Sequence, residues 1–114
     1  MWNIDNSLSL HKIQNAVNIN KEIQQKIINQ LRQYNPLYIG LFGSYARGDN
    51  DEHSDLDILV SFSSRLTLID LVRIKNQLSE NLNITIDLIT EQSLHPKIKS
   101  YIKKDLQMIY YAEK

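Results

Sequence analysis

Two short apolar runs of strand length, residues 37–42 and 56–62, lie on either side of a polar segment that contains glycine. Such runs, bounded by turn-forming residues, are typical of strands buried in a sheet. In the second run the even positions are all apolar, from Leu56 to Phe62, so a strand places them on one face. The chain is therefore expected to build a sheet, covered by elements from the flanking segments.

The segment before the first run has the spacing of an amphipathic helix. Asn20 suits its N-cap, and Asn35-Pro36 ends it because proline disfavours helical backbone in the preceding residue. The apolar stripe consists of Ile23, Ile27, Ile28, Leu31 and Tyr34. Residues 1–19 have only loosely helical spacing, so either an N-terminal extension packed on the domain or a short helix is expected there, with the domain proper at 20–114.

The second half of the chain alternates helix and strand signals. Thr67 and Asp70 resemble a capping box with Asp in place of Glu, and they begin a predicted helix. Its stripe consists of Leu68, Leu71, Val72, Lys75, Leu78 and Leu82. A third strand is predicted at residues 84–89 and a last one at 108–111. Between them, Pro96 suits the first turn of a helix that carries Ile98, Tyr101 and Ile102. This order predicts a small α/β domain with helices covering a sheet.

Composition narrows the class of protein. A length of 114 residues with 42% hydrophobic content suits one domain. The absence of cysteine excludes disulfide scaffolds and thiolate chemistry. Equal numbers of basic and acidic residues, 13 each, argue against a dedicated nucleic-acid binder. No apolar run is long enough to cross a bilayer and the start lacks a signal-peptide pattern, so we expect a cytoplasmic protein with no membrane partner.

Strand periodicity puts Asp55 and Asp57 together on the face opposite the apolar side chains. Their Cα atoms would lie about 6.6 Å apart, and their carboxylates could approach to roughly 5 Å. Two ionised carboxylates at that distance repel by about 3 kcal/mol at an effective dielectric of about 20, so the pair requires a cation or a shared proton. Oxygen ligands favour Mg²⁺, and two such ions ~3.5 to 4 Å apart would fit between them.

Asp87 interrupts the third predicted strand, where an acidic residue is disfavoured unless its neighbours use it. If that strand lies beside residues 56–62 in the right register, Asp87 becomes a third carboxylate of the cluster. The alternative is that Asp87 sits on an exposed face of the sheet. The sequence leaves both open.

The start of the polar segment, Gly43-Ser44, has two interpretations. Ser44 suits an N-cap and Gly48 the residue after the last turn, so about one helical turn is expected between them. The free N–H groups of such a turn, with glycine before it, suit a phosphate group. A plain turn from strand to helix explains the same residues.

The remaining charged residues are open to more than one role. Arg47 suits bidentate contact with a triphosphate, or a salt bridge to the acidic loop. His53 is expected to be a loop residue rather than a general base. Solvated loop charges are expected at Asp49, Asp51 and Glu52. A solvated helix face, or contact with RNA or an acidic partner, explains Lys97, Lys99, Lys103 and Lys104.

Gly43-Ser44, the later Asp55-Leu-Asp57 and the single Asp87 on a further strand together resemble the signature of the DNA polymerase β-like nucleotidyltransferase superfamily. The stretch from Gly43 to Val60 is similar to its minimal nucleotidyltransferase branch, which includes the MntA-type antitoxins of HEPN/MNT toxin–antitoxin pairs. The resemblance extends from about residue 20 to 111. It implies a single polymerase β-like domain with a small mixed sheet and flanking helices.

The resemblance also implies a role for each motif residue. Gly43 and Ser44 would hold the β and γ phosphates of an NTP. Asp55 and Asp57 would bind two Mg²⁺ ions, and Asp87 would ligate one of them and help to deprotonate the acceptor hydroxyl. Within the MntA branch the donor would be ATP, and the acceptor a tyrosine of a cognate HEPN ribonuclease toxin in a hetero-oligomer.

Two other functions remain open at this stage. The first is transfer to a small hydroxyl compound, as in the aminoglycoside nucleotidyltransferases, which usually carry a further substrate-binding domain. A chain of 114 residues has no room for one. The second is a non-catalytic antitoxin that acts by binding alone. Polymerase activity is not expected, because no basic template-binding domain is present.

Overall fold

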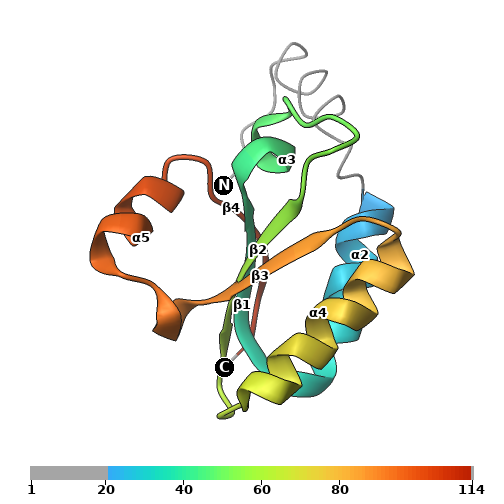
Figure 1. The fold of residues 1–114 in the computed structure, drawn as a ribbon. Coiled ribbons are helices and arrows are strands. Elements are labelled where there is room, and N and C mark those ends of the chain that lie inside the picture. Colours follow the sequence, from blue (N-terminus) through green and yellow to red (C-terminus); the bar gives the residue numbers. More distant parts are fainter. Residues whose placement is uncertain (1–20, 114) are drawn as a thin grey trace.

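The structure is a computed structural model that describes residues 21–113, so the predictions for residues 1–19 and for the N-cap Asn20 lie outside it. Helices and strands alternate along the chain much as the sequence predicts (Figure 1). The elements are α2 (Lys21–Leu31), the 3₁₀ turn η1 (Arg32–Tyr34), β1 (Pro36–Phe42), α3 (Gly43–Arg47), β2 (Leu56–Phe62), α4 (Leu68–Leu82), β3 (Ile86–Thr90), the 3₁₀ turn η2 (Glu91–Ser93), α5 (Pro96–Ile102) and β4 (Gln107–Tyr111).

The four strands form one sheet in the order β3-β2-β1-β4. β1 is antiparallel to both β2 and β4, whereas β2 and β3 are parallel. The parallel connection runs through α4, as a crossover between parallel strands requires. The small mixed sheet and the α/β class are therefore confirmed.

The main core lies between the sheet and the helices α2 and α4, which both cover one side of it, while α5 projects from the other side (Figure 1). Fully buried side chains meet there from both layers: Ile27, Leu31, Ile39, Leu41, Leu56, Ile58, Val60, Ile74, Leu78 and Ile86. Each contributes about 1.5–3 kcal/mol by leaving water. Within residues 21–113 no helix is long and apolar enough to cross a membrane.

Short-range signals are confirmed where the interacting groups are neighbours in sequence. Thr67 and Asp70 form a reciprocal capping box at the start of α4, with N–H to oxygen distances of 3.1 and 2.9 Å. Pro96 lies in the first turn of α5. Asn35 adopts a left-handed conformation (φ 55°) immediately before Pro36 and ends the helical segment.

Two sequence predictions are wrong in detail. The stripe of α4 is rotated: Ile74 is fully buried, whereas Leu68 and Val72 are 76% and 49% exposed. Two overlapping stripes with helical spacing exist in this segment, and the packing of α4 against α2 and β3 selects the one that contains Ile74. The third strand begins at Ile86 instead of residue 84, because α4 extends to Leu82 and Asn83 closes it in a left-handed conformation.

Candidate active site

The parallel pairing of β2 and β3 brings two acidic side chains together. Asp57 and Asp87 are direct partners in the register, on strands about 4.8 Å apart. The two carboxyl groups share a hydrogen bond, and Asp57 is half-buried while Asp87 is exposed to solvent. Asp87 therefore lies beside Asp57, and of the two placements left open by the sequence the structure shows the clustered one.

Asp55 completes the cluster from the residue that precedes β2. It lies two positions before Asp57, so the alternation of an extended chain directs it to the same face. Asp55 is exposed, and its charge acts on Asp57. The structure thus gathers all three predicted carboxylates at one end of the sheet.

The pKa of Asp57 is raised to about 6. Desolvation by burial is the largest cause, followed by the charge of Asp87 and the hydrogen bond between the two carboxyls. The charge of Asp55 adds to this, while Arg47 acts in the opposite direction. Near neutral pH the cluster holds repelling negative charge that a proton or a cation relieves.

Gly43 contacts this cluster from the end of β1. Its neighbour Phe42 pairs with Asp57 across the antiparallel ladder, and Gly43 itself has φ of 76°. A Cβ atom at this position would collide with Oδ2 of Asp57 and lie 3.1 Å from its Cγ. Position 43 therefore requires glycine for two reasons: the backbone is left-handed, and the carboxylate of Asp57 lies where a Cβ atom would be.

The helical turn α3 follows directly, but the predicted N-cap is wrong. Ser44 lies inside the first turn, and the N-cap position belongs to Phe42, whose backbone is extended and whose side chain cannot cap. The turn therefore begins at Gly43, two residues before the start at Tyr45 that a serine cap would give. In the part of the chain that the structure describes, no hydrogen bond engages the Ser44 hydroxyl. Gly48 ends the turn with φ of 87°, as predicted.

Arg47 forms the salt bridges that the sequence proposed as one of its two roles. Its Nε lies 3.1 Å from Asp49 and its Nη1 lies 2.9 Å from Asp105. These hydrogen bonds, first the one to Asp49, hold the pKa of Arg47 above its ordinary value. Because Arg47 also lowers the pKa of Asp57, its positive charge is felt by the carboxylate cluster.

Two residues that position α3 were missed by the sequence analysis. Asp105 holds Arg47, and Gln107 at the start of β4 donates an amide hydrogen to the carbonyl of Ala46 at 2.8 Å. Both lie about sixty positions along the chain from their partners, so only the pairing of β4 with β1 reveals them.

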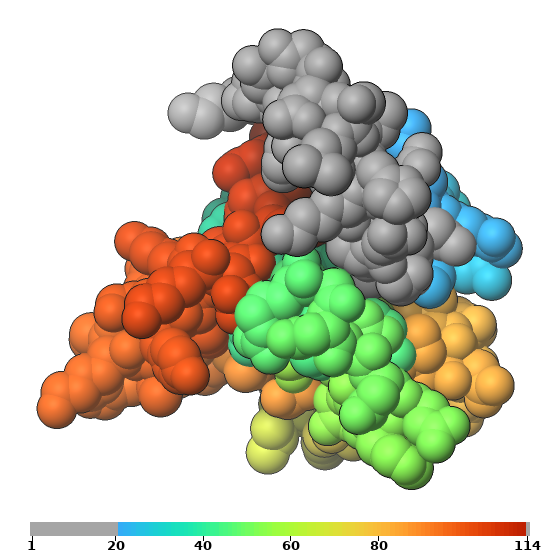
Figure 2. Space-filling view, turned by 90° about the horizontal axis from the view of Figure 1, so that it is seen from above, coloured from blue at the N-terminus to red at the C-terminus, as the bar shows by residue number. Residues whose placement is uncertain are grey.

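In the loop between α3 and β2, the charges predicted to be solvated at Asp49, Asp51 and Glu52 are all exposed, although Asp49 also pairs with Arg47. Asp51 accepts hydrogen bonds from the backbone of His53 and from the hydroxyl of Ser54, at 2.8 and 3.3 Å. The side chains of Glu52 and His53 are each 85% exposed. Seen from above, α3 and this loop, in green, form an exposed surface, and α5, in orange, projects to one side (Figure 2).

The donor chemistry of the cluster suits Mg²⁺, which prefers carboxylate oxygens and completes its shell with water and phosphate oxygens. Residues 21–113 contain no preformed group of three or more ligands. Nevertheless Asp57 and Asp87 are direct partners on neighbouring strands, and Asp55 adds a third charge that helps to raise the pKa of Asp57. A divalent cation would relieve the repulsion among these carboxylates, so the residues fit such an ion.

Comparison with known proteins agrees with this site. Residues 24–109 match the model of a family described as "Nucleotidyltransferase domain". A protein of Methanocaldococcus jannaschii, named as a protein adenylyltransferase, is 45% identical over 86 residues, which are 75% of this chain and 91% of the relative.

A second relative, the protein adenylyltransferase MntA of Thermococcus cleftensis, is 35% identical over 60% of this chain and 69% of its own length. Among solved structures, a toxin–antitoxin crystal structure with AMP-PNP superimposes with a TM-score of 0.72 at 26% identity. The match covers 79% of this chain and 74% of that one.

Proposed function

Because the chain belongs to the nucleotidyltransferase domain family, we propose that it transfers AMP from ATP to a hydroxyl group of a partner protein. The observation that carries this proposal is the register of Asp57 with Asp87, because it puts two carboxylates side by side at one end of the sheet. The choice of ATP and of a protein acceptor is supported by relatives that are named protein adenylyltransferases and by the similar complex that contains AMP-PNP.

In this reaction the acceptor oxygen forms a bond to the α-phosphorus, the bond between the α-phosphorus and the bridging oxygen breaks, and pyrophosphate leaves. Asp87, the exposed member of the cluster, accepts the hydroxyl proton. Asp55 and Asp57, with Asp87, would hold two Mg²⁺ ions. Bound Mg²⁺ would supply the positive charge that stabilises the attacking and leaving oxygens.

The residues of α3 would bind the β and γ phosphates, which leave as pyrophosphate. The N–H groups at its start have no capping side chain, and the Ser44 hydroxyl lies in the same turn. These features support our proposal that Gly43 and Ser44 bind the β and γ phosphates. Arg47, held by Asp49 and Asp105, contributes positive charge beside the cluster, and direct contact of its guanidinium with the triphosphate stays a prediction.

For the acceptor we propose a tyrosine of a cognate HEPN ribonuclease toxin, with this chain as the antitoxin in a hetero-oligomer in the cytoplasm. Support comes from the relative named MntA and from the toxin–antitoxin complex that shares the fold at 26% identity. Modification of the toxin would then require this chain to bind it at the end of the sheet where the carboxylates lie.

The test is to incubate the protein and Mg²⁺ with each of the four NTPs, labelled at the α-phosphate, and with the product of the neighbouring gene. We expect label from ATP on that product, and loss of labelling by at least a hundredfold in Asp57→Asn. Asp51→Asn is the matched control, because Asp51 shapes the loop without joining the cluster. Labelling that survives Asp57→Asn, or label on neither protein, would overturn the proposal.

The same variants separate catalysis from binding. In cells that express the toxin, the enzymatic mechanism predicts that protection disappears in the double variant Asp55→Ala/Asp57→Ala. Full protection by that variant would instead establish an antitoxin that acts by contact alone.

A further inference from the structure

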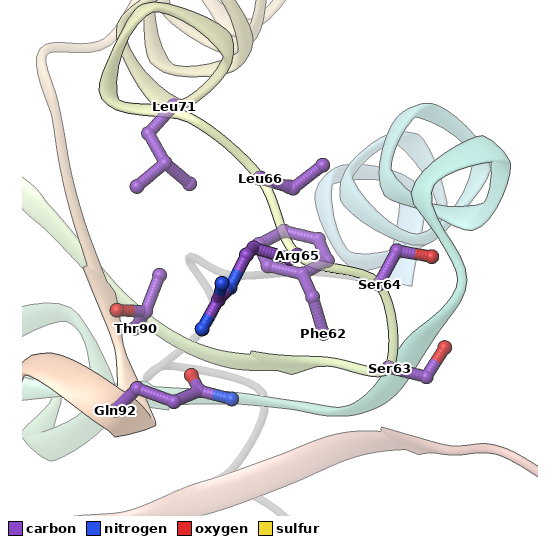
Figure 3. Close-up of a pocket in the computed structure, with 8 residues that line it drawn as sticks. All are labelled: Phe62, Ser63, Ser64, Arg65, Leu66, Leu71, Thr90 and Gln92. Atoms are coloured by element: carbon purple, nitrogen blue, oxygen red, sulfur yellow. The ribbon is translucent and has the colours of Figure 1, made fainter.

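A second concave site lies at the end of the sheet opposite the carboxylates. It is a cavity of about 430 Å³ between the carboxyl ends of β2 and β3 and the start of α4. Its lining includes Phe62, Arg65, Leu66, Leu71, Thr90 and Gln92 (Figure 3). Asp57 lies near the start of β2 and Phe62 at its end. At a rise of about 3.3 Å per residue, the carboxylate cluster and the cavity are therefore about 16 Å apart.

The position of the cavity favours ligand binding. β2 and β3 run parallel, so their carboxyl ends meet at the same edge of the sheet. In open α/β sheets, the crevice outside these ends is a recurrent place for a ligand. The volume lies within the range of about 300–1,000 Å³ that is typical of small-molecule sites.

Arg65 supplies the charge of this site. Within residues 21–113 its guanidinium has no hydrogen bond or ion pair, in contrast to Arg47 with its two carboxylate partners. Figure 3 shows the guanidinium turned toward Thr90 and Gln92, whose hydroxyl and amide groups lie on the same side of the cavity. A guanidinium beside neutral polar groups suits two oxygens of one anion.

The acidic residues nearest in sequence to this cavity are already engaged by other groups. Asp70 caps α4 through the backbone N–H of Thr67. Glu91 pairs with Lys99 at 3.5 Å and accepts a hydrogen bond from Tyr38. Neither carboxylate is therefore available to neutralise Arg65, whose positive charge faces the cavity unpaired.

The cavity is also lined by apolar side chains. Phe62 is 6% exposed and packs edge to face against Tyr34, which fixes its ring, while Leu66 and Leu71 are partly exposed above it. An ion alone would leave this apolar surface uncovered, whereas a ligand with an apolar body would bury it.

We propose that this cavity binds a small organic anion. Its carboxylate or phosphate monoester head lies on Arg65, with Thr90 and Gln92 as further hydrogen-bond partners, and its apolar body packs on Phe62, Leu66 and Leu71. The proposal does not depend on the transferase activity, because none of these residues belongs to the carboxylate cluster or to α3.

The test uses the full chain labelled with ¹⁵N and titrated without Mg²⁺ by phenyl phosphate, phenylacetate, benzyl alcohol and inorganic phosphate. We expect phenyl phosphate or phenylacetate to cause saturable shifts of the amide signals of Thr90 and Gln92. The probe that binds more tightly identifies the preferred head group. Benzyl alcohol, which lacks charge, and inorganic phosphate, which lacks the apolar body, should each bind at least tenfold more weakly.

Variants at exposed positions complete the test. Arg65→Gln should weaken binding of the better probe at least tenfold, Arg65→Lys should restore part of it, and Arg73→Gln, an exposed arginine on α4, should leave it unchanged. The spectra report at the same time whether each variant is folded. The proposal is wrong if neither organic anion gives saturable shifts at the cavity, if inorganic phosphate binds equally well, or if Arg65→Gln binds like the native chain.

Discussion

At the scale of single residues, the site depends on one contact between a glycine and an aspartate. Gly43 begins α3 directly after β1, Asp57 lies on β2, and the carboxylate of Asp57 occupies the space where any other residue would have its Cβ atom. The sequence predicted that Gly43 lets backbone approach a ligand. In the structure the group that approaches is a residue of the candidate site itself, and no local pattern could show this because the two strands must first be paired.

Gly43→Ala should therefore reduce AMP transfer at least a hundredfold and lower the free energy of unfolding by about 1–2 kcal/mol from backbone strain alone. Gly48→Ala is the matched control, since Gly48 also has a positive φ (87°) but shows no such contact with Asp57. Urea unfolding and transfer assays on both variants measure the two effects. Equal losses of activity in the two variants would show that strain, and not the displaced carboxylate, is responsible.

At the scale of elements, sequence reasoning succeeded where both partners of an interaction are close in the chain. The capping box of α4 and the proline at the start of α5 belong to this class. The orientation of β2 was also predictable, because its even positions are all apolar and side chains alternate between the two faces of a strand. The face of α4 was not, since Leu68 and Val72 have the same helical spacing as the buried stripe and only packing separates them.

Contacts between distant elements were beyond the reach of the sequence, and the anchor of α3 is the clearest case. Gln107→Ala leaves the carbonyl of Ala46 without its partner and loosens the turn that carries the proposed phosphate contacts. We expect KM for ATP to rise about threefold to tenfold with a smaller change in kcat, and stability to fall by about 1 kcal/mol.

Gln33→Ala is the control for this prediction, because Gln33 makes the same kind of amide-to-carbonyl bond to Gln30, far along the chain from α3. Steady-state kinetics of both variants give the comparison. An unchanged KM in Gln107→Ala would show that the bond does not position the nucleotide.

At the scale of the whole molecule, a formal net charge of zero conceals an uneven distribution. Five of the 13 acidic residues lie between positions 49 and 57, and Asp87 joins them through the sheet. Arg65, which has no ion pair among residues 21–113, lies at the other end of the same strands. The parallel pair β2 and β3 thus has negative charge at its amino ends and a positive group at its carboxyl ends, which suits the binding of cations at one end and of organic anions at the other.

The concentrated negative charge should make global stability depend on pH in a definite direction. The folded-state pKa of Asp57, about 6, lies above its ordinary value of 3.8, so between these two values the folded chain binds more protons than the unfolded chain. The free energy of unfolding should therefore fall as pH rises from about 4 to about 6, by about 1–2 kcal/mol once the half-exposed position of the carboxyl is allowed for. Urea unfolding in EDTA at pH 4.5 and 7.5 measures this change in the free energy of unfolding.

The variant Asp57→Asn is the control. Its stability should depend less on pH, and it should be more stable than the native chain at pH 7.5. Mg²⁺ should stabilise the native chain at pH 7.5 and have little effect on the variant. A native chain that gains stability over this pH range would contradict the proposed repulsion within the cluster.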